Sequence, residues 1–307
     1  MKKIIITGAN GFVGYWLIKE MSKLDVEILA VIKDENEDVQ MLSDFKNVRI
    51  VYCDLCNILN LGDIISDRDV DVFYHFAWVS AGGKGRSNYG IQLMNAKYSC
   101  DAANVAKIIG CKKILFSGTI TEKIAENILN IDVKAENIIY GICKHTVHCL
   151  MDVVSKQIGI DYVWMRFSNL YGPYSINGNI VGYTLAELLK GNDASFGSAN
   201  QPYDLLYIED LVHAAYLLGE NTTKNNCYYL GSGNARILSD FLYEIGDICN
   251  KRSNIKIGIR QDDGLEYNMN WFDGSAIVKE FGFKPKYSLS DGVLNTIKWM
   301  EEINNGI

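Results

Sequence analysis

The stretch KIIITGANGFVG, residues 3–14, joins a short run of β-branched residues to a glycine-rich turn. The run predicts a buried strand, and the apolar spacing that follows it over residues 12–24 predicts a helix. Gly8 permits a tight turn, Gly11 a close approach of the backbone to a diphosphate, and Gly14 the packing of helix on strand. A diphosphate would meet backbone N–H groups and the positive end of the helix dipole there. The stretch therefore predicts a dinucleotide site, which also includes Asn10, Phe12 and Val13.

Further short apolar runs bounded by turn residues predict parallel strands that helices cover on both faces. These runs cover residues 26–32, 48–53, 70–76, 112–117 and 160–168. Stretches with helical spacing cover residues 58–66, 90–110, 137–159 and 182–191. Because strands and helices alternate, we expect right-handed crossovers. The predicted fold class is α/β, a Rossmann-type doubly wound parallel sheet.

The alternation loosens after Asn169. Residues 170–179 read as a loop, and residues 205–219 as a strand that runs into a helix. We expect a smaller, mixed α/β carboxy-terminal lobe that binds the substrate. The predicted division is a dinucleotide-binding domain at 1–168, to which 205–230 returns, and a substrate lobe at 169–204 and 231–307.

Composition narrows the classes of function. The chain has 307 residues and a net charge of -7, which argues against a nucleic-acid partner. No apolar run approaches the roughly 20 residues that span a bilayer. The first strand begins at once and leaves no room for a signal peptide, so we expect a soluble, cytoplasmic protein with its eight cysteines reduced. His145 and His148 lie three apart, but no nearby residue in the sequence completes a metal site, so none is predicted.

The end of the second predicted strand bears on the choice of dinucleotide. NAD-binding proteins place an acidic residue there to accept the ribose hydroxyls. Ile32 and Lys33 occupy that position in this chain, and Lys33 could pair with a 2′-phosphate. NADP(H) is therefore favoured. NAD(H) stays possible because Asp34 and Glu35 follow directly.

Two later segments are expected to contact the same cofactor. The loop CDLCN (53–57) should place Asp54 and Leu55 against the adenine. The segment HFAW (75–78), which includes Phe76 and Ala77, should lie under the ribose and the pyrophosphate.

The segment YGICK places Tyr140 and Lys144 four residues apart, on one face of a predicted helix. Reduction of a ketone needs an acid at the carbonyl oxygen, and a free tyrosine titrates near 10. A lysine ammonium about 4 Å away contributes roughly 4 kcal/mol at an effective dielectric constant of 20. We therefore expect Lys144 to lower the pKa of the Tyr140 phenol to near neutral pH, and to bind the nicotinamide ribose.

The chain resembles the extended short-chain dehydrogenase/reductases that act on nucleotide sugars. The resemblance covers nearly the whole length and depends on motifs that follow one another in the family's order: TGANGFVG (7–14), CDL (53–55), HFA (75–77), Asn95, FSGT (116–119), YGICK (140–144), RFSNLYGP (166–173) and LLYIEDL (205–211). It implies that Asn95 belongs to the cofactor site. It also implies that Tyr140 and Lys144 act with a third group, Thr119, or failing that Ser117, which hydrogen-bonds the reacting oxygen.

The resemblance also implies a substrate site. Asn169 matches the position that meets the nucleotide diphosphate, and Arg260 looks like the late arginine that pairs with phosphate. Tyr203 stands where the family often has an arginine, and Arg236 is a candidate to replace it. Family habit further suggests a homodimer formed by the helices at 90–110 and 137–159.

The residues after Thr119 bear on the reaction. Sugar dehydratases of this family continue with an Asp–Glu pair, whereas this chain has Ile120 and Thr121, with Glu122 one position late. The favoured function is an NADPH-dependent 4-ketoreductase of an NDP-4-keto-(di)deoxyhexose, since SGT (117–119) resembles the paratose and abequose synthases, which reduce CDP-4-keto-3,6-dideoxyhexoses. The alternatives are an NAD-dependent NDP-sugar 4-epimerase, a reductase of small carbonyls, and a catalytically idle dinucleotide-sensing or scaffold protein.

Overall fold

A seven-stranded sheet forms the centre of the protein, seen in a computed structural model that describes residues 1–129, 135–175, 178–262 and 264–304. Its strand order is β11-β6-β5-β4-β1-β2-β3, and every pair of neighbours is parallel. The strands are β1 (Lys3–Thr7), β2 (Glu27–Ile32), β3 (Val48–Tyr52), β4 (Val72–His75), β5 (Lys113–Thr119), β6 (Asp161–Phe167) and β11 (Cys227–Leu230). The order reverses direction between β1 and β4, so the predicted doubly wound Rossmann-type fold is confirmed.

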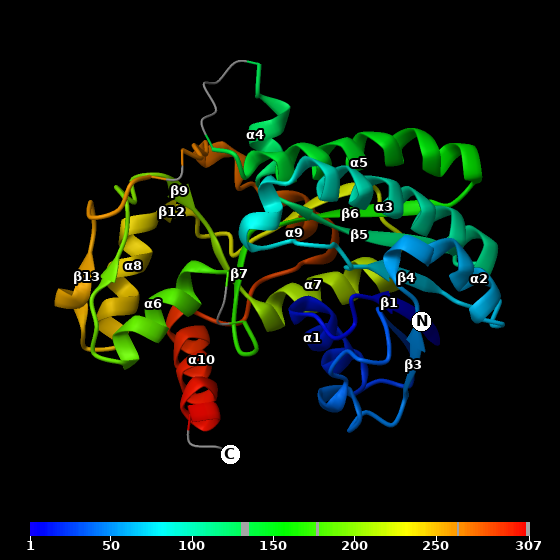
Figure 1. The fold of residues 1–307 in the computed structure, drawn as a ribbon, viewed down its shortest axis with the longest axis horizontal. Coiled ribbons are helices and arrows are strands. Elements are labelled where there is room, and N and C mark those ends of the chain that lie inside the picture. Colours follow the sequence, from blue (N-terminus) through cyan, green and yellow to red (C-terminus); the bar gives the residue numbers. More distant parts are fainter. Residues whose placement is uncertain (130–134, 176–177, 263, 305–307) are drawn as a thin grey trace.

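Helices cover both faces of this sheet (Figure 1). Ile4 and Ile6 of β1 pack into one core with α1 (Phe12–Met21) and α7 (Ile208–Glu220). Ile5 points to the other side, where a second core contains α3 (Tyr89–Ile109) and α5 (Ile138–Ile158). All three isoleucines are fully buried, as the strand's apolar sequence requires.

Local signals set the ends of the two long helices. The side chain of Asn88 caps α3 by accepting a hydrogen bond from the N–H of Ile91. Gly110 and Gly159 end α3 and α5 in the left-handed conformation that favours glycine. Helices α3 and α5 pack side by side over the sheet (Figure 1).

The remaining elements form a group to one side of the sheet in Figure 1. Strand β7 (Asn169–Tyr171) follows β6 almost directly, so this group adjoins the carboxyl ends of the sheet strands. It contains the parallel pairs β7–β10 and β8–β13 and the antiparallel pair β9–β12. Its other elements are α6 (Ile180–Leu189), β8 (Ala194–Ser195), β9 (Pro202–Tyr203), β10 (Leu205–Tyr207), β12 (Arg236–Ile237), α8 (Leu238–Ile248), β13 (Ile255–Lys256) and α10 (Leu289–Asn304). Helix α9 (Ser275–Phe281) instead packs against β11 of the central sheet (Figure 1).

Three local features differ from the expectations. Part of the predicted loop 170–179 is β7; residues 176 and 177 of it lie outside the described residues. The predicted helix at 58–66 is a 3-10 segment, η2 (Leu55–Asn60), followed by the short α2 (Leu61–Ile64). Helix α4 (Glu122–Glu126) was not expected. Such elements are too short for hydrophobic periodicity to mark them. In the described parts of the chain, the helices are all too short or too polar to cross a membrane.

Candidate active site

The glycine loop between β1 and α1 leaves no room for a side chain at Gly8 or Gly14. Gly8 has a φ of +67°, and a Cβ there would lie 2.9 Å from the backbone nitrogen of Ala77. A Cβ on Gly14 would lie 2.2 Å from the carbonyl oxygen of Gly8. The N–H of Gly11 donates to that same carbonyl at 3.0 Å. The turn therefore brings bare backbone and the first N–H groups of α1 to the surface, which fits a dinucleotide diphosphate.

A cavity of about 290 Å³ opens beside this loop. Six residues predicted to bind the cofactor line it: Gly8, Asn10, Lys33, Asp54, Leu55 and Ala77. Glu37, which the sequence did not single out, lines it as well, and its carboxylate accepts a 3.3 Å hydrogen bond from Asn10. Glu37 lies four residues past Lys33, beyond the strand end where a ribose-binding carboxylate is expected.

Asn95 and Phe76 are among the predicted cofactor residues that do not line this cavity. The side-chain amide of Asn95 is buried and holds the backbone of Val79, accepting at 2.8 Å and donating at 2.9 Å. The ring of Phe76 packs between those of Tyr74 and Phe167. Asn95 thus holds the loop after β4 in place, and a cofactor role for Asn95 and Phe76 stays a prediction. Phe12 and Val13 pack against the core, so only their backbone is placed to meet a ligand.

Helix α5 carries the predicted catalytic pair. The ammonium of Lys144 donates to the carbonyl oxygen of Ser117 at 2.5 Å and to its hydroxyl at 3.2 Å. The same ammonium lies 3.8 Å from the centre of the Trp78 ring, and Trp78 meets the Tyr140 ring edge-on at 5.9 Å. Ser117 therefore positions Lys144. Trp78 is a contact of both members of the pair that the sequence did not reveal.

Burial dominates the acid–base properties of this pair. It raises the pKa of Tyr140 to about 12 and lowers the pKa of Lys144 to about 7. The nearby charge that lowers the pKa of Tyr140 is the Arg86 guanidinium. Removal from water opposes the charged form of both groups, so burial outweighs the nearby positive charge at Tyr140. That Lys144 brings the pKa of Tyr140 close to neutral pH stays a prediction.

Thr119 ends β5 beside a buried carboxylate. Its N–H donates to Oε1 of Glu122 at 2.6 Å. The Trp164 indole donates to both Glu122 oxygens at 3.0 and 2.9 Å, and Arg166 pairs with Oε2 at 3.2 Å. A Cβ on Gly118 would lie 2.2 Å from the indole nitrogen and 2.7 Å from Oε1 of Glu122. Glu122 therefore supports the strand end that carries Thr119 and is turned away from the solvent.

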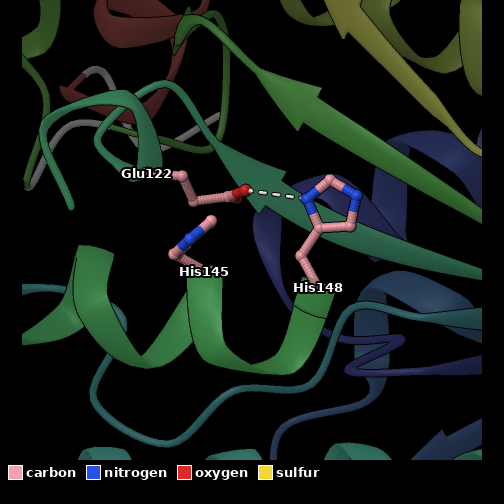
Figure 2. A group of neighbouring side chains, drawn as sticks. All are labelled: Glu122, His145 and His148. Atoms are coloured by element: carbon pink, nitrogen blue, oxygen red, sulfur yellow. Dashed lines mark ion pairs between the residues drawn. The ribbon is translucent and has the colours of Figure 1, made fainter. Parts of the chain in front are cut away.

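Glu122 is also the third member of a group with His145 and His148 (Figure 2). Its carboxylate points at the His148 ring, with Oε2 and Nδ1 3.6 Å apart. The sequence offered no third ligand, because only the fold brings α4 against α5. Glu122 already accepts hydrogen bonds from two N–H groups, those of Thr119 and the Trp164 indole, besides the Arg166 guanidinium, whose charge opposes a second cation. We therefore assign the group to charge balance around Glu122.

A second cavity, of about 250 Å³, lies at the carboxyl ends of β5 and β6. Thr119 and Tyr140 line it together with Asn169 and Tyr203, so four predicted site residues meet here. Arg86 lines it too, although the sequence did not single it out. The described lining residues include no carboxylate, imidazole or thiol.

The two predicted substrate arginines have different surroundings. Arg260 donates to the Tyr183 hydroxyl at 2.6 Å and lines a neighbouring cavity, which shares Ile180 and Gln201 with the cavity at Tyr140. Arg236 pairs with Glu244 and stacks on Phe241. This ion pair ties Arg236 to α8, and a role for Arg236 in substrate binding stays a prediction.

The sequence that forms this site matches the model of one protein family. A family model named "NAD dependent epimerase/dehydratase family" matches residues 4–231. The chain belongs to that family. The match spans the glycine loop, Thr119 and the Tyr140–Lys144 pair, and it confirms the predicted membership of the extended short-chain dehydrogenase/reductases.

Individual members of the family cover the whole chain. The dTDP-4-dehydro-6-deoxyglucose reductase of Escherichia coli is 26% identical, over 96% of each chain. The solved UDP-glucose 4-epimerase of Thermotoga maritima, in complex with UDP-glucose, has a TM-score of 0.83 and 19% identity over 98% of this chain and 99% of its own. The dTDP-glucose 4,6-dehydratase of Bacillus anthracis, in complex with NAD, has a TM-score of 0.80 and 19% identity over 99% and 98%. The family fold thus serves several reactions.

Proposed function

We propose that this protein is an NADPH-dependent 4-ketoreductase of an NDP-4-keto-(di)deoxyhexose. The observation that carries the proposal is the cavity at Tyr140, which holds a tyrosine acid and the Thr119 hydroxyl without a carboxylate among its described lining residues. Such a set suits proton transfer to a carbonyl oxygen. The 26% identity to a dTDP-4-dehydro-6-deoxyglucose reductase supports the substrate class.

The mechanism assigns one task to each side chain. Tyr140 gives its proton to the carbonyl oxygen of the substrate, and the Thr119 hydroxyl donates a hydrogen bond to that oxygen. Lys144, held by Ser117, stabilises the phenolate that remains. A bound nicotinamide dinucleotide supplies the hydride. Asn169 and Arg260 are assigned to the nucleotide diphosphate.

Elimination of water is not supported by the same residues. A 4,6-dehydratase needs an acid and a base beside the sugar, in addition to the tyrosine. Glu122 is the nearest carboxylate along the chain to Thr119, but it is fully buried and bonded to Thr119, Trp164 and Arg166. It is therefore not placed to act on a leaving hydroxyl.

The residues at the adenosine end of the cofactor cavity bear on the choice between NADPH and NAD. Lys33 lines that cavity and suits a 2′-phosphate, whereas Glu37 beside it suits free ribose hydroxyls. If Glu37 dominates, NAD binds better. The second candidate function is then an NAD-dependent NDP-sugar 4-epimerase.

A substrate panel tests the proposal. The purified protein is incubated with CDP-, dTDP-, GDP- and UDP-4-keto-6-deoxyhexoses and either NADPH or NADH, and the products are identified by mass spectrometry. We expect one equivalent of NADPH oxidised per sugar reduced, with Tyr140→Phe at least about 100-fold slower. Interconversion of NDP-hexoses without added cofactor would instead establish the epimerase. Cofactor binding without turnover of either class would refute both.

We also propose a homodimer formed through α3 and α5. Large apolar side chains are exposed on these neighbouring helices: Leu93 and Met94 on α3, and Leu150 and Val153 on α5. An exposed apolar surface commonly marks an interface, and these side chains could form one. Sedimentation of the native protein and of Leu93→Glu/Val153→Glu tests this, because the two charges should yield monomers. A native monomer would contradict the dimer.

A further inference from the structure

The loop between β4 and α3 places a cation on the ring of Tyr140. Arg86 belongs to the 3-10 segment η3 (Gly83–Ser87), and its guanidinium carbon lies 4.2 Å from the centre of that ring. A guanidinium at this distance from an aromatic face is attracted by the ring's electrons. Arg86 also lines the cavity that holds Thr119 and Tyr140. The cation therefore contacts the proposed acid inside the proposed substrate site.

Arg86 differs from other arginines in having no polar partner within the part of the chain that the structure describes. Arg166, Arg236 and Arg252 each pair with a carboxylate. The Nε of Arg86 is buried without a hydrogen-bond partner. An unpaired buried donor costs free energy of folding. The attraction between the Arg86 guanidinium and the Tyr140 ring offsets part of that cost.

Hydrogen bonds to one buried glutamine fix the loop in this position. Nε2 of Gln92 donates to the carbonyl oxygens of Gly85 at 2.9 Å and of Ser80 at 3.2 Å. Its Oε1 accepts from the Trp78 indole at 2.7 Å. A Cβ on Gly85 would lie 2.3 Å from the Cβ of Ser80, so the loop closes tightly just before Arg86. Arg86 is thus presented by an ordered turn.

Three charged groups from three described elements bear on Tyr140: Arg86 of η3, Lys144 of α5 and Glu122 of α4. Glu122 disfavours the phenolate by its negative charge. Burial lowers the pKa of Lys144 to about 7, so its positive charge is only partly present at neutral pH. A guanidinium keeps its charge throughout this range.

We propose that Arg86 is a positioning residue that holds a permanent positive charge against the Tyr140 ring and stabilises the phenolate formed during the reaction. The proton of the Tyr140 hydroxyl moves to the carbonyl oxygen of the substrate, while a hydride from the nicotinamide cofactor moves to the carbonyl carbon. The negative charge left on the tyrosine then faces Arg86 as well as Lys144. This inference rests on the proposed role of Tyr140 as the acid.

The test follows the ionisation of residue 140 without substrate. Difluorotyrosine, whose phenol is several units more acidic than that of tyrosine, replaces Tyr140, and its titration is followed by fluorine NMR. Arg86→Gln should raise its pKa by about one unit, given the usual strength of a cation–π contact. Arg86→Lys should cause a smaller rise in the same direction. Lys84→Gln, which removes an exposed cation from the same loop, should leave the pKa unchanged.

Kinetics separate this role from substrate binding. In Arg86→Gln with native Tyr140, kcat should fall by about tenfold while KM stays near its native value, because the contact strengthens only as negative charge forms on Tyr140 in the transition state. An unchanged pKa of residue 140, or a rise in KM alone, would overturn the proposal. If Arg86→Gln does not fold, the pKa of residue 140 is measured in Arg86→Lys, and an unchanged value there overturns the proposal. Because the titration needs no substrate, it stands even if the reductase assignment fails.

Discussion

The backbone N–H of Thr119 donates a 2.6 Å hydrogen bond to Oε1 of Glu122, a carboxylate that is completely buried. Burial alone would raise the pKa of Glu122. The ion pair with His148 and the Arg166 charge outweigh burial and lower that pKa overall. The carboxylate therefore stays charged and fixes the strand end on which the Thr119 hydroxyl stands.

Glu122→Gln should disturb both stability and turnover. The amide would point an N–H₂ group at either the Thr119 N–H or the Trp164 indole, both of which are donors. Breaking a buried pair commonly costs about 3–5 kcal/mol. We expect a loss in that range by chemical denaturation, and a lower kcat. Glu126→Gln, which removes the more exposed partner of Arg166, is the control and should cost less. Equal losses in the two variants would contradict this role of Glu122.

Lys33 and Glu37 should set the cofactor preference in opposite directions. Lys33→Glu should weaken NADPH binding, because a carboxylate repels the 2′-phosphate, and Glu37→Gln should weaken NADH binding. A hydrogen bond to a charged group is worth about 1.5–3 kcal/mol, or roughly 10- to 150-fold in Kd. Isothermal titration calorimetry measures both. Tighter binding of NADH than NADPH by the native protein would favour the epimerase.

Arg260→Ala should weaken substrate binding by roughly 10- to 150-fold, the cost of losing a hydrogen bond to a charged group. The change should appear in KM if the diphosphate is held equally in ground and transition states. NADPH affinity should not change. Arg252→Ala, which removes an exposed arginine paired with Asp247, is the control and should leave KM unaltered. Damage to cofactor binding would show that Arg260 meets a different ligand.

His148 should make the free energy of unfolding decrease as the pH rises into the alkaline range. Burial opposes its protonation, but contacts with Cys227 and Glu122 raise its pKa to about 9, from 6.5. Because the folded-state value is the higher one, the stabilisation is complete below about pH 6.5 and is lost as pH rises through about 9. The cost of His148→Gln should be larger near pH 6 than near pH 10, by on the order of 3 kcal/mol. A cost independent of pH would contradict the charged His148–Glu122 pair.

His213 provides the opposite control. Burial lowers the pKa of His213 in the folded protein. Its contribution to the free energy of unfolding is therefore present above the pKa of the unfolded state and is lost as pH falls. The cost of His213→Gln should therefore shrink at acid pH. Urea unfolding across the range measures both variants.

The sequence predicts well those features that a local pattern carries. The strand 3–7 and the glycine loop need only one apolar run and three glycines, and both lie as expected. Tyr140 and Lys144 share a helix, so their spacing alone brings them to one side. Thr119 was placed by its position in a family motif.

Features that depend on contacts between distant segments escaped prediction. Arg86 reaches Tyr140 only because Gln92 folds the loop after β4 back on itself. Glu122 meets His148 because α4, too short for a periodic signal, packs on α5. The pKa of Lys144 depends on how completely it is buried, which no spacing rule reveals.

Gly118 has a consequence for how homologous sequences can vary. A side chain at position 118 would collide with both the Trp164 indole and the Glu122 carboxylate, so these three positions form one steric unit. Homologues with alanine or serine at 118 should carry a smaller residue at 164 or lack the carboxylate at 122, and substitutions at the three sites should be inherited together. Introducing alanine or serine at 118 alone into this chain should fail where the matched set succeeds.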